Sequence, residues 1–239
     1  MQTMPWTGPK VEESKAKARR FLQDNSLSLV MFGLFFVVTI IGQSLAGQRV
    51  YSEEQLQHGG QAVSYLEYIR TAHFGEATFE NWESEFLQMA AYVVLTIWLR
   101  QRGSSESKQV EGDDPVDEDP SKHTKDRDAP APVRRGGLAL ALYRNSLSIA
   151  FFVLFLLSWW LHALTGASEY NSEQLEHGAQ AVSTLGYVTR SQFWFESLQN
   201  WQSEFMAVGA IVLLSVWLRQ QGSPESKPVH APHRETGTG

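Results

Sequence analysis

The chain has 239 residues, a formal net charge of −6 and a hydrophobic content of 43%. It contains no cysteine, which excludes a disulfide framework, a thiolate metal site and a cysteine nucleophile. The mean hydropathy of −0.26 is that of many soluble proteins, yet this average conceals long uncharged segments that alternate with very polar ones.

An internal repeat organises the chain. The segment from Asn25 to Lys108 recurs from Asn145 to Lys227, and about 38 of roughly 84 aligned positions are identical once one residue is dropped near Ala46. Each copy holds a long apolar segment, a polar segment, the motif Asn-Trp-x-Ser-Glu-Phe, a shorter apolar segment and the motif Leu-Arg-Gln-x-Gly-Ser. The repeat therefore predicts a duplicated structural unit.

The first apolar segment of each copy predicts a transmembrane helix. Leu27 to Ala46 has about 20 uncharged positions and Leu147 to Leu164 about 18, enough at ~1.5 Å per residue to cross most of a ~30 Å hydrocarbon core. We place these spans at about 26–46 and 145–165, after a basic tail of residues 1–24. The alternative for the first is a cleaved signal peptide, because Ser44-Leu45-Ala46 resembles a cleavage site. The second copy has no such motif, which favours the span.

The polar segment that comes next predicts an amphipathic helix on the outer face of the membrane. Ser52 to Gln55 has the pattern of a capping box, and a helix of about 18 residues follows, with apolar and polar positions on opposite faces. The second copy repeats this pattern. Glutamate and histidine four residues apart could converge on a metal ion, although a solvated helix face gives the same pattern; these weak metal candidates are Glu54, His58, Glu173 and His177.

The second apolar segment of each copy is short, and its span must include polar residues. Running about 20 residues back from the inner end gives spans of about 79–101 and 198–220, which place Glu85 and Glu204 below the outer boundary. A carboxylate at that depth must be paired, hydrated or protonated. His162 is the only histidine inside a predicted span and could pair with Glu204; its alternative is an interfacial position beside two tryptophans. The candidate intramembrane polar site comprises Glu85, Glu204, Gln88, Tyr92, Thr96 and His162.

Small residues near the middle of these spans predict close helix packing rather than a ligand site, because small side chains let helices approach within a bilayer. They are Ala90, Ala91, Gly209 and Ala210.

The distribution of lysine and arginine predicts the orientation. Residues 10–20, 100–144 and 219–234 carry 17 of these cations, and the two intervening loops carry 3. Positive charge collects on the cytoplasmic side, so both termini and the linker are expected there. The linker, residues 104–143, and the tail, residues 223–239, have the composition of disordered chain. They flank repeat units at 25–103 and 144–222.

With the motifs Asn-Trp-x-Ser-Glu-Phe, Trp-Leu-Arg-Gln-x-Gly-Ser and Gly-Ser-Pro-Glu-Ser-Lys-Pro-Val in place, the chain resembles an uncharacterised family of bacterial membrane proteins classed as a domain of unknown function. The resemblance implies a bacterial membrane protein and supplies no catalytic residue. We expect it in the cytoplasmic (inner) membrane.

Together these observations predict an all-α protein of four transmembrane helices, arranged as two tandem parallel repeats. The leading functional hypothesis is a non-enzymatic structural or regulatory membrane component without a cofactor. Its partners would be the lipid bilayer, another copy of the chain, or a cytoplasmic protein that meets the linker or tails, with no nucleic acid. The alternatives are a small ion, proton or solute transporter or channel that uses Glu85 and Glu204, and a membrane metalloenzyme that uses the outer glutamate–histidine pairs.

Overall fold

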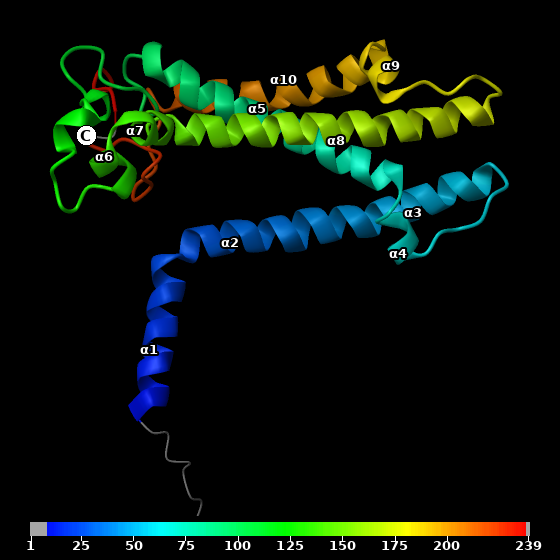
Figure 1. Ribbon diagram of the computed structural model, residues 1–239, viewed down its shortest axis with the longest axis horizontal. Helices are drawn as coiled ribbons and strands as arrows, with labels where there is room; N and C mark the ends of the chain where they lie inside the picture. Colours follow the sequence, from blue (N-terminus) through cyan, green and yellow to red (C-terminus); the bar gives the residue numbers. More distant parts are fainter. Residues whose placement is uncertain (1–8, 238–239) are drawn as a thin grey trace, which may run out of the picture. The chain divides into compact units, whose positions relative to one another are not determined.

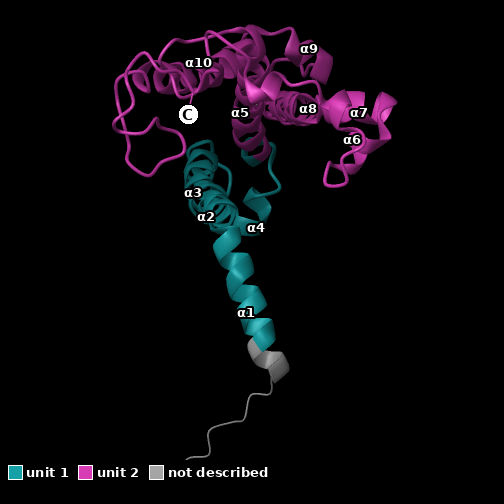
Figure 2. Ribbon diagram, turned by 90° about the vertical axis from the view of Figure 1, so that its left-hand side faces the viewer, with its two compact units in different colours: residues 1–74 teal, residues 75–239 magenta. Residues whose placement is uncertain are grey.

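A computed structural model describes residues 9–237, and the described residues form helices, turns and loops without a β-strand (Figure 1). The all-α prediction is confirmed for this part of the chain. The chain divides into two compact units, residues 1–74 (unit 1) and residues 75–239 (unit 2), shown in separate colours in Figure 2.

Unit 1 contains one long helical segment. After α1 (Pro9–Asp24), helix α2 (Ser26–Leu34), the π-helix η1 (Phe35–Ile41) and α3 (Gly42–Gln57) follow one another directly, and the short α4 (Tyr65–Tyr68) comes after a loop. The predicted first span thus forms a helix that continues past its outer end.

The π-helix explains the extra residue of the first copy. A π-turn closes over one more residue than an α-turn, so it can absorb an insertion without rotating the rest of the helix. If the gap in the repeat alignment lies within η1, Gln43 aligns with His162 and Gly47 with Gly166. Both glycines then occupy the same environment, since a Cβ at Gly47 would meet the ring of Tyr68 and a Cβ at Gly166 the ring of Tyr187.

The prediction of an 18-residue amphipathic helix after Ser52 is wrong. Helix α3 runs through the expected cap at Ser52 and ends at Gln57, because Gly59 takes a positive φ of 79° that breaks the helix. The capping box lies later, between Ser64 and Glu67 at the start of α4. The second copy behaves alike: α8 (Ser146–Glu176) ends before Gly178, whose φ is 71°, and α9 (Thr184–Val188) follows.

Unit 2 is built on three long helices, α5 (Ala72–Trp98, from Gly75 onward in this unit), α8 and α10 (Ser191–Leu214). Its hydrophobic core lies where α8, α9 and α10 meet, and consists of Ala163, Ala167, Tyr187 and Phe193. The connection from α5 to α8 contains η2 (Pro115–Asp117), η3 (Pro120–His123), α6 (Ala131–Arg135) and α7 (Gly137–Tyr143).

The linker and the C-terminal tail, expected to be disordered, make specific contacts in unit 2. Ser104 Oγ lies 2.8 Å from Ser215 Oγ, and the backbone N–H of Gly103 donates to Thr236 Oγ1 at 2.9 Å. The buried ammonium of Lys227 donates to the carbonyl of Glu235 at 2.8 Å. These serine and backbone hydrogen bonds join the start of the linker to the tail and to the end of α10.

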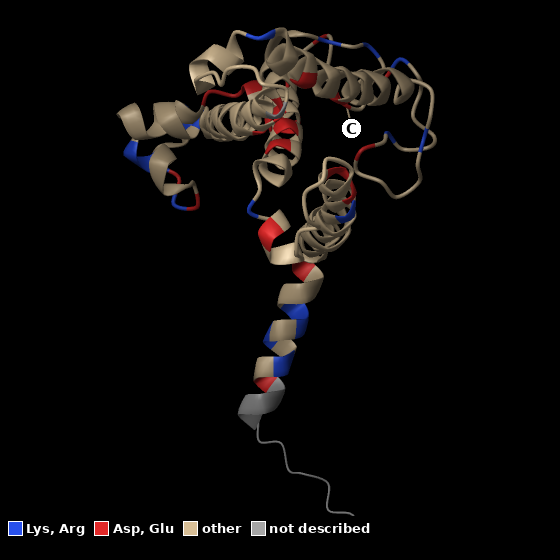
Figure 3. Cartoon of the chain, turned by 90° about the vertical axis from the view of Figure 1, so that its right-hand side faces the viewer, with Lys and Arg blue, Asp and Glu red and all other residues tan. Residues whose placement is uncertain are grey.

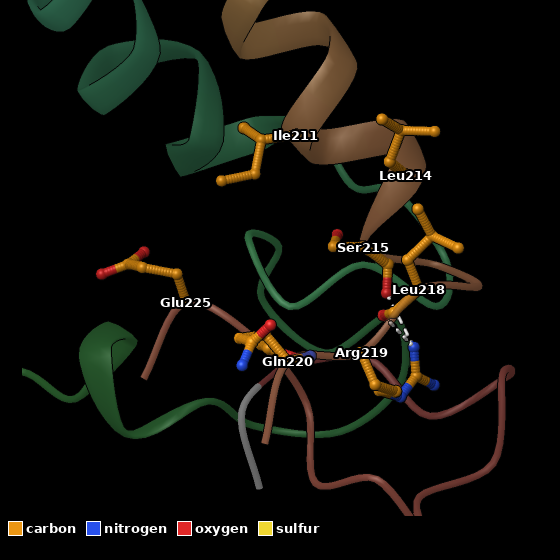
Figure 4. A pocket seen from close by; sticks show the side chains of 8 residues that line it. Ile211, Leu214, Ser215, Leu218, Arg219, Gln220 and Glu225 are labelled. Atoms are coloured by element: carbon orange, nitrogen blue, oxygen red, sulfur yellow. Dashed lines mark hydrogen bonds between the residues drawn. The ribbon is translucent and has the colours of Figure 1, made fainter. Parts of the chain in front are cut away.

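A pocket of about 340 Å³ lies where α10 meets this tail (Figure 4). The guanidinium of Arg219 donates to the carbonyl of Ser215 at 3.0 Å there, which satisfies one of the last carbonyls of the helix. Arg100 makes the equivalent contact at the end of α5, at 3.1 Å from the carbonyl of Ile97. The repeated Leu-Arg-Gln motif is therefore a helix C-terminal cap.

Two helical segments are long and apolar enough to cross a membrane, residues Ser26–Gln57 and Ser146–Leu175. Only 6% and 17% of their apolar windows are buried within the protein, so most of their hydrophobic side chains are exposed. Helices α5 and α10 have 27 and 24 residues, about 40 and 36 Å at 1.5 Å per residue, but α5 carries four glutamates between residues 76 and 85. Four spans remain a prediction.

The small residues predicted to mark helix contacts behave differently from one another. Ala90 is buried, Ala91 and Ala210 are half-buried, and Gly209 is exposed with no atom within 4 Å of a Cβ built on it. The close approaches in unit 2 lie instead at Gly75, against Thr165, and at Gly166, against Tyr187.

Gly166 gives a direct test of this packing. A Cβ there would lie 2.7 Å from Tyr187 Cε1 and 2.9 Å from Glu76 Oε1, so we expect Gly166→Ala to lower the thermal stability in detergent by the equivalent of about 1–3 kcal/mol. Gly209→Ala is the matched control, since it adds a methyl group to open space and improves helix propensity. Equal melting temperatures for the two variants would contradict the described packing.

Candidate functional site

The centre of the site is a buried pair between α5 and α8. His162 Nδ1 lies 2.7 Å from Glu83 Oε2, and both side chains are 0% exposed. This distance is typical of a charge-assisted hydrogen bond, in which Nδ1–H donates to the carboxylate. The bond holds the imidazole ring in one orientation.

The opposite ring nitrogen faces a second carboxylate. His162 Nε2 lies 3.4 Å from Glu196 Oε2 on α10, a longer separation than that to Glu83. The imidazole also stacks on Phe193, with ring centroids 4.8 Å apart and planes 24° from parallel. An aromatic wall and two carboxylates therefore fix the ring.

Tyr187 and Gln192 hold the Glu196 carboxylate. The Tyr187 hydroxyl donates to Glu196 Oε2 at 2.5 Å and lies 3.4 Å from Glu76 Oε1 on α5. The side-chain amide of Gln192 donates to the other oxygen, Oε1, at 2.5 Å. The tyrosine thus links carboxylates from two helices that are far apart in the sequence.

Glu80, one helical turn before Glu83, also belongs to this assembly, because Asn200 of α10 hydrogen-bonds to its carboxylate and the charge of His162 acts on it. We call the whole set the Glu–His cluster; its members are Glu76, Glu80, Glu83, His162, Tyr187 and Glu196. The acidic residues of α5 are the red bands along that helix in Figure 3.

Carboxylates outnumber cationic groups in the cluster by four to one, since only His162 can carry a positive charge. Burial and the neighbouring carboxylates of Glu196 and Glu169 raise the pKa of Glu76, which precedes the predicted span, to about 8. A carboxyl group with so high a pKa holds a proton at neutral pH unless another cation replaces it. The cluster therefore carries more acidic than basic groups, and the raised pKa of Glu76 means that this carboxyl group is protonated at neutral pH.

Three members converge closely enough to share one ion. Glu76, His162 and Glu196 each offer one ligand atom, and these atoms all lie within 4.8 Å of one another. Among the described residues, no other group of three or more acidic or histidine side chains brings its ligand atoms so close together.

The predicted intramembrane polar site is only partly brought together. His162 is central, and its carboxylate partners are Glu83 and Glu196 rather than Glu204, which the sequence offered as one possible partner beside an interfacial position. Glu85 is exposed and Glu204 half-buried, although each lies near enough to the other for their charges to interact.

The three remaining members of the predicted intramembrane polar site lie farther along α5. Gln88 is buried, the Tyr92 hydroxyl donates to Glu106 at 2.7 Å, and the Thr96 hydroxyl donates to the carbonyl of Tyr92 at 2.9 Å. These contacts satisfy the polar groups within α5 and the start of the linker.

The outer glutamate–histidine pairs make helix-end contacts. His58 Nδ1 lies 3.0 Å from the carbonyl of Glu54, and His177 Nδ1 lies 2.8 Å from the carbonyl of Glu173. Both histidines are exposed and satisfy backbone carbonyls where α3 and α8 end.

Sequence reasoning missed five members of the cluster, yet a signal for most of them exists in the repeat. Each charged member occupies a position where the other copy has an uncharged residue: Phe195 for Glu76, Gln199 for Glu80, Gln202 for Glu83, Gln43 for His162 and Ala77 for Glu196. A search for titratable residues present in one copy only would have selected these positions. Tyr187 gives no such signal, because Tyr68 is its equivalent.

Comparison with known proteins adds a family and no activity. A family model described as a domain of unknown function (DUF6766) matches residues 18–238. No curated protein and no solved structure matches the chain.

Glu83 and Glu85 form a matched pair of positions that tests the described rotation of α5. Glu83→Ala leaves His162 without its buried partner, for which we expect a stability loss of about 3–5 kcal/mol. Glu85→Ala removes an exposed carboxylate and should change stability by less than about 0.5 kcal/mol. Thermal unfolding in the same detergent measures both; a larger loss for Glu85→Ala would show that the opposite face of α5 is buried.

Proposed function

Since the chain belongs to the DUF6766 family, whose description names no activity, we propose from its own geometry that it is an integral membrane protein that transports a cation through the Glu–His cluster. The single observation that carries this proposal is the excess of carboxylates, one of them buried and three half-buried, around His162. The competing proposal is a structural or regulatory membrane component in which the cluster only joins helices.

The exposed apolar surface supports a membrane location. Large hydrophobic side chains of α2, η1 and α8 are about half or more exposed, including Phe32, Val37 and Val153. Contiguous apolar surface of this extent is unfavourable in water and favourable in lipid. We propose four spans at about 26–46, 79–101, 145–165 and 198–220 in the inner membrane of a bacterium.

The distribution of basic residues supports an orientation with both termini and the linker in the cytoplasm. In this orientation α8 starts on the cytoplasmic side at Ser146. His162 lies 16 residues later, about 24 Å along the helix. The cluster is then closer to the outer surface than to the inner one.

The chemistry of the cluster supports cation binding over nucleophilic catalysis. Both ring nitrogens of His162 face carboxylates, whereas a histidine that activates a nucleophile hydrogen-bonds to a hydroxyl or thiol. Ionisable residues within membrane spans commonly mark ion or proton pathways. A transported cation would balance the surplus carboxylate charge.

Single cysteines test the topology directly, because the chain has none of its own. With Gln61→Cys or Gln180→Cys, we expect labelling of intact cells by a membrane-impermeant maleimide. With Ser121→Cys or Val229→Cys, labelling should require permeabilised cells. All four positions are exposed, so the reverse pattern would overturn the orientation.

Flux in proteoliposomes tests transport. We expect the wild-type protein to conduct protons, a monovalent cation or a divalent cation above the rate of empty liposomes, measured with ion-sensitive dyes. Glu196→Gln should reduce that flux at least 10-fold, because it removes one of the two carboxylates that the Tyr187 hydroxyl joins.

Two further variants separate this site from the one predicted by hydropathy. Under the present proposal, Glu85→Gln and Glu204→Gln retain flux, because neither carboxylate is part of the cluster. Loss of flux in those variants with normal flux in Glu196→Gln would move the pathway to Glu85 and Glu204. A wild-type protein without flux of any of these cations would favour the structural role.

A further inference from the structure

We propose that Glu76, His162 and Glu196 bind one divalent first-row metal ion, such as Zn²⁺, Mn²⁺ or Fe²⁺, and that Glu83 is the residue that positions His162 for it. This inference rests on the proposed function, because it names the class of cation that the same cluster takes.

The separations between ligand atoms fit a small metal ion. In tetrahedral coordination with bonds of about 2.0–2.1 Å, two ligand atoms lie about 3.4 Å apart. His162 Nε2 and Glu196 Oε2 are 3.4 Å apart, and the Glu76 ligand atom lies within 4.8 Å of both. Reducing a separation of 4.8 Å to about 3.4 Å needs a shift of the Glu76 carboxylate of at most about 1.4 Å.

Glu83 gives His162 the tautomer that a metal needs. In the neutral imidazole, a proton on Nδ1 donates to Glu83 across the 2.7 Å contact, and the Nε2 lone pair then faces the Glu196 carboxylate. Metal-binding histidines commonly donate their other N–H to a carboxylate in this way, which fixes the ring and raises its basicity. The competing occupant is a proton on Nε2, which would make His162 a bridge between two glutamates.

The carboxylate that positions His162 has one oxygen without a protein partner. Glu83 Oε1 is buried on a side chain that is 0% exposed, and no hydrogen-bond donor among the described residues reaches it. Buried polar atoms of this kind are rare in folded proteins and call for a partner such as a water molecule. Because Glu83 contacts the Nδ1 side of the ring and the proposed ion lies on the Nε2 side, this oxygen bears on the position of His162 and not on the ion itself.

The backbone is shaped to let the ligands lie against α8. Gly166 is buried one helical turn after His162, and a Cβ there would come within 2.9 Å of Glu76 Oε1 and of the Tyr187 hydroxyl. Any side chain would displace a proposed ligand and the tyrosine that joins the two carboxylates. Glycine therefore keeps the space that Glu76 occupies.

The ligand set indicates the class of metal. One imidazole with two carboxylates suits Zn²⁺, Mn²⁺ and Fe²⁺, whereas Cu⁺ prefers sulfur ligands. Mg²⁺ prefers six oxygen ligands and keeps most of its water, which makes it the appropriate comparison ion.

Elemental analysis and calorimetry with purified full-length protein test the site. After chelator treatment, we expect one equivalent of Zn²⁺ or Mn²⁺ to bind saturably, with Mg²⁺ at least 100-fold weaker. His162→Gln and Glu76→Gln should abolish stoichiometric binding. Glu83→Gln retains an acceptor for Nδ1–H but not the charge, and should weaken binding about 10- to 100-fold.

Two variants serve as controls, Glu173→Gln near the end of α8 and His177→Gln at its C-cap. Both positions lie outside the proposed site, so these variants should bind Zn²⁺ or Mn²⁺ as the wild type does. X-ray absorption of the Zn²⁺-loaded protein provides a readout that a folding defect does not imitate. We expect nitrogen and oxygen ligands at about 2.0–2.1 Å with one imidazole, and loss of the imidazole signal in a His162→Gln variant that still runs as a folded species on size exclusion.

The outcomes for the metal and for transport can be told apart. Stoichiometric Zn²⁺ or Mn²⁺ binding without flux supports the metal site and overturns the proposed transport. Proton or monovalent flux without divalent binding supports transport and overturns the metal site, leaving His162 as a protonated bridge. Divalent binding that is lost in His177→Gln and kept in His162→Gln would also overturn the proposed ligands.

Discussion

The hydrogen bond between Glu83 and His162 is the contact on which unit 2 depends. Removing two ionisable groups from water costs several kcal/mol for each ion, and only good geometry and further hydrogen bonds offset that cost. The 2.7 Å contact meets the first condition. Glu196, held by Tyr187 and Gln192, meets part of the second, which requires α9 and α10 to cover the site. The packing of these helices and the chemistry of the cluster therefore have one cause.

The duplicated sequence has produced an asymmetric site. Shared positions such as Tyr68 and Tyr187, or Gly47 and Gly166, build the same local contact in each copy. The charged groups of the cluster come instead from positions at which the copies differ, with acids on α5 of the first copy and on α10 of the second. One shared scaffold thus supplies the packing, and divergence of its two copies supplies one acidic site.

Hydropathy directed attention to the right helix but to the wrong face of α5. Counting back from the inner end directed attention to Glu85, whereas the buried partner of His162 is Glu83. Two steps along a helix rotate the side-chain direction by about 200°, so residues two apart lie on nearly opposite faces. An error in the assumed rotation therefore exchanges the buried and exposed faces. The prediction of a helix start at Ser52 was wrong for a different reason. The long helix α3 already passes through Ser52, so the capping pattern there cannot begin a new helix, and the positive φ of Gly59 then ends α3.

By itself the sequence determined the helical class, the two long apolar helices, the repeated motifs and the end of α5 at its Leu-Arg-Gln motif, whereas α10 ends at Leu214, before the corresponding motif. These features depend on composition, periodicity and local backbone preference, which short stretches of chain carry with them. The tertiary structure alone decided which carboxylates surround His162, because Glu83 lies 79 residues before it and Glu196 lies 34 residues after it. Such contacts depend on the rotation and close approach of three helices, and no single segment of the chain specifies them.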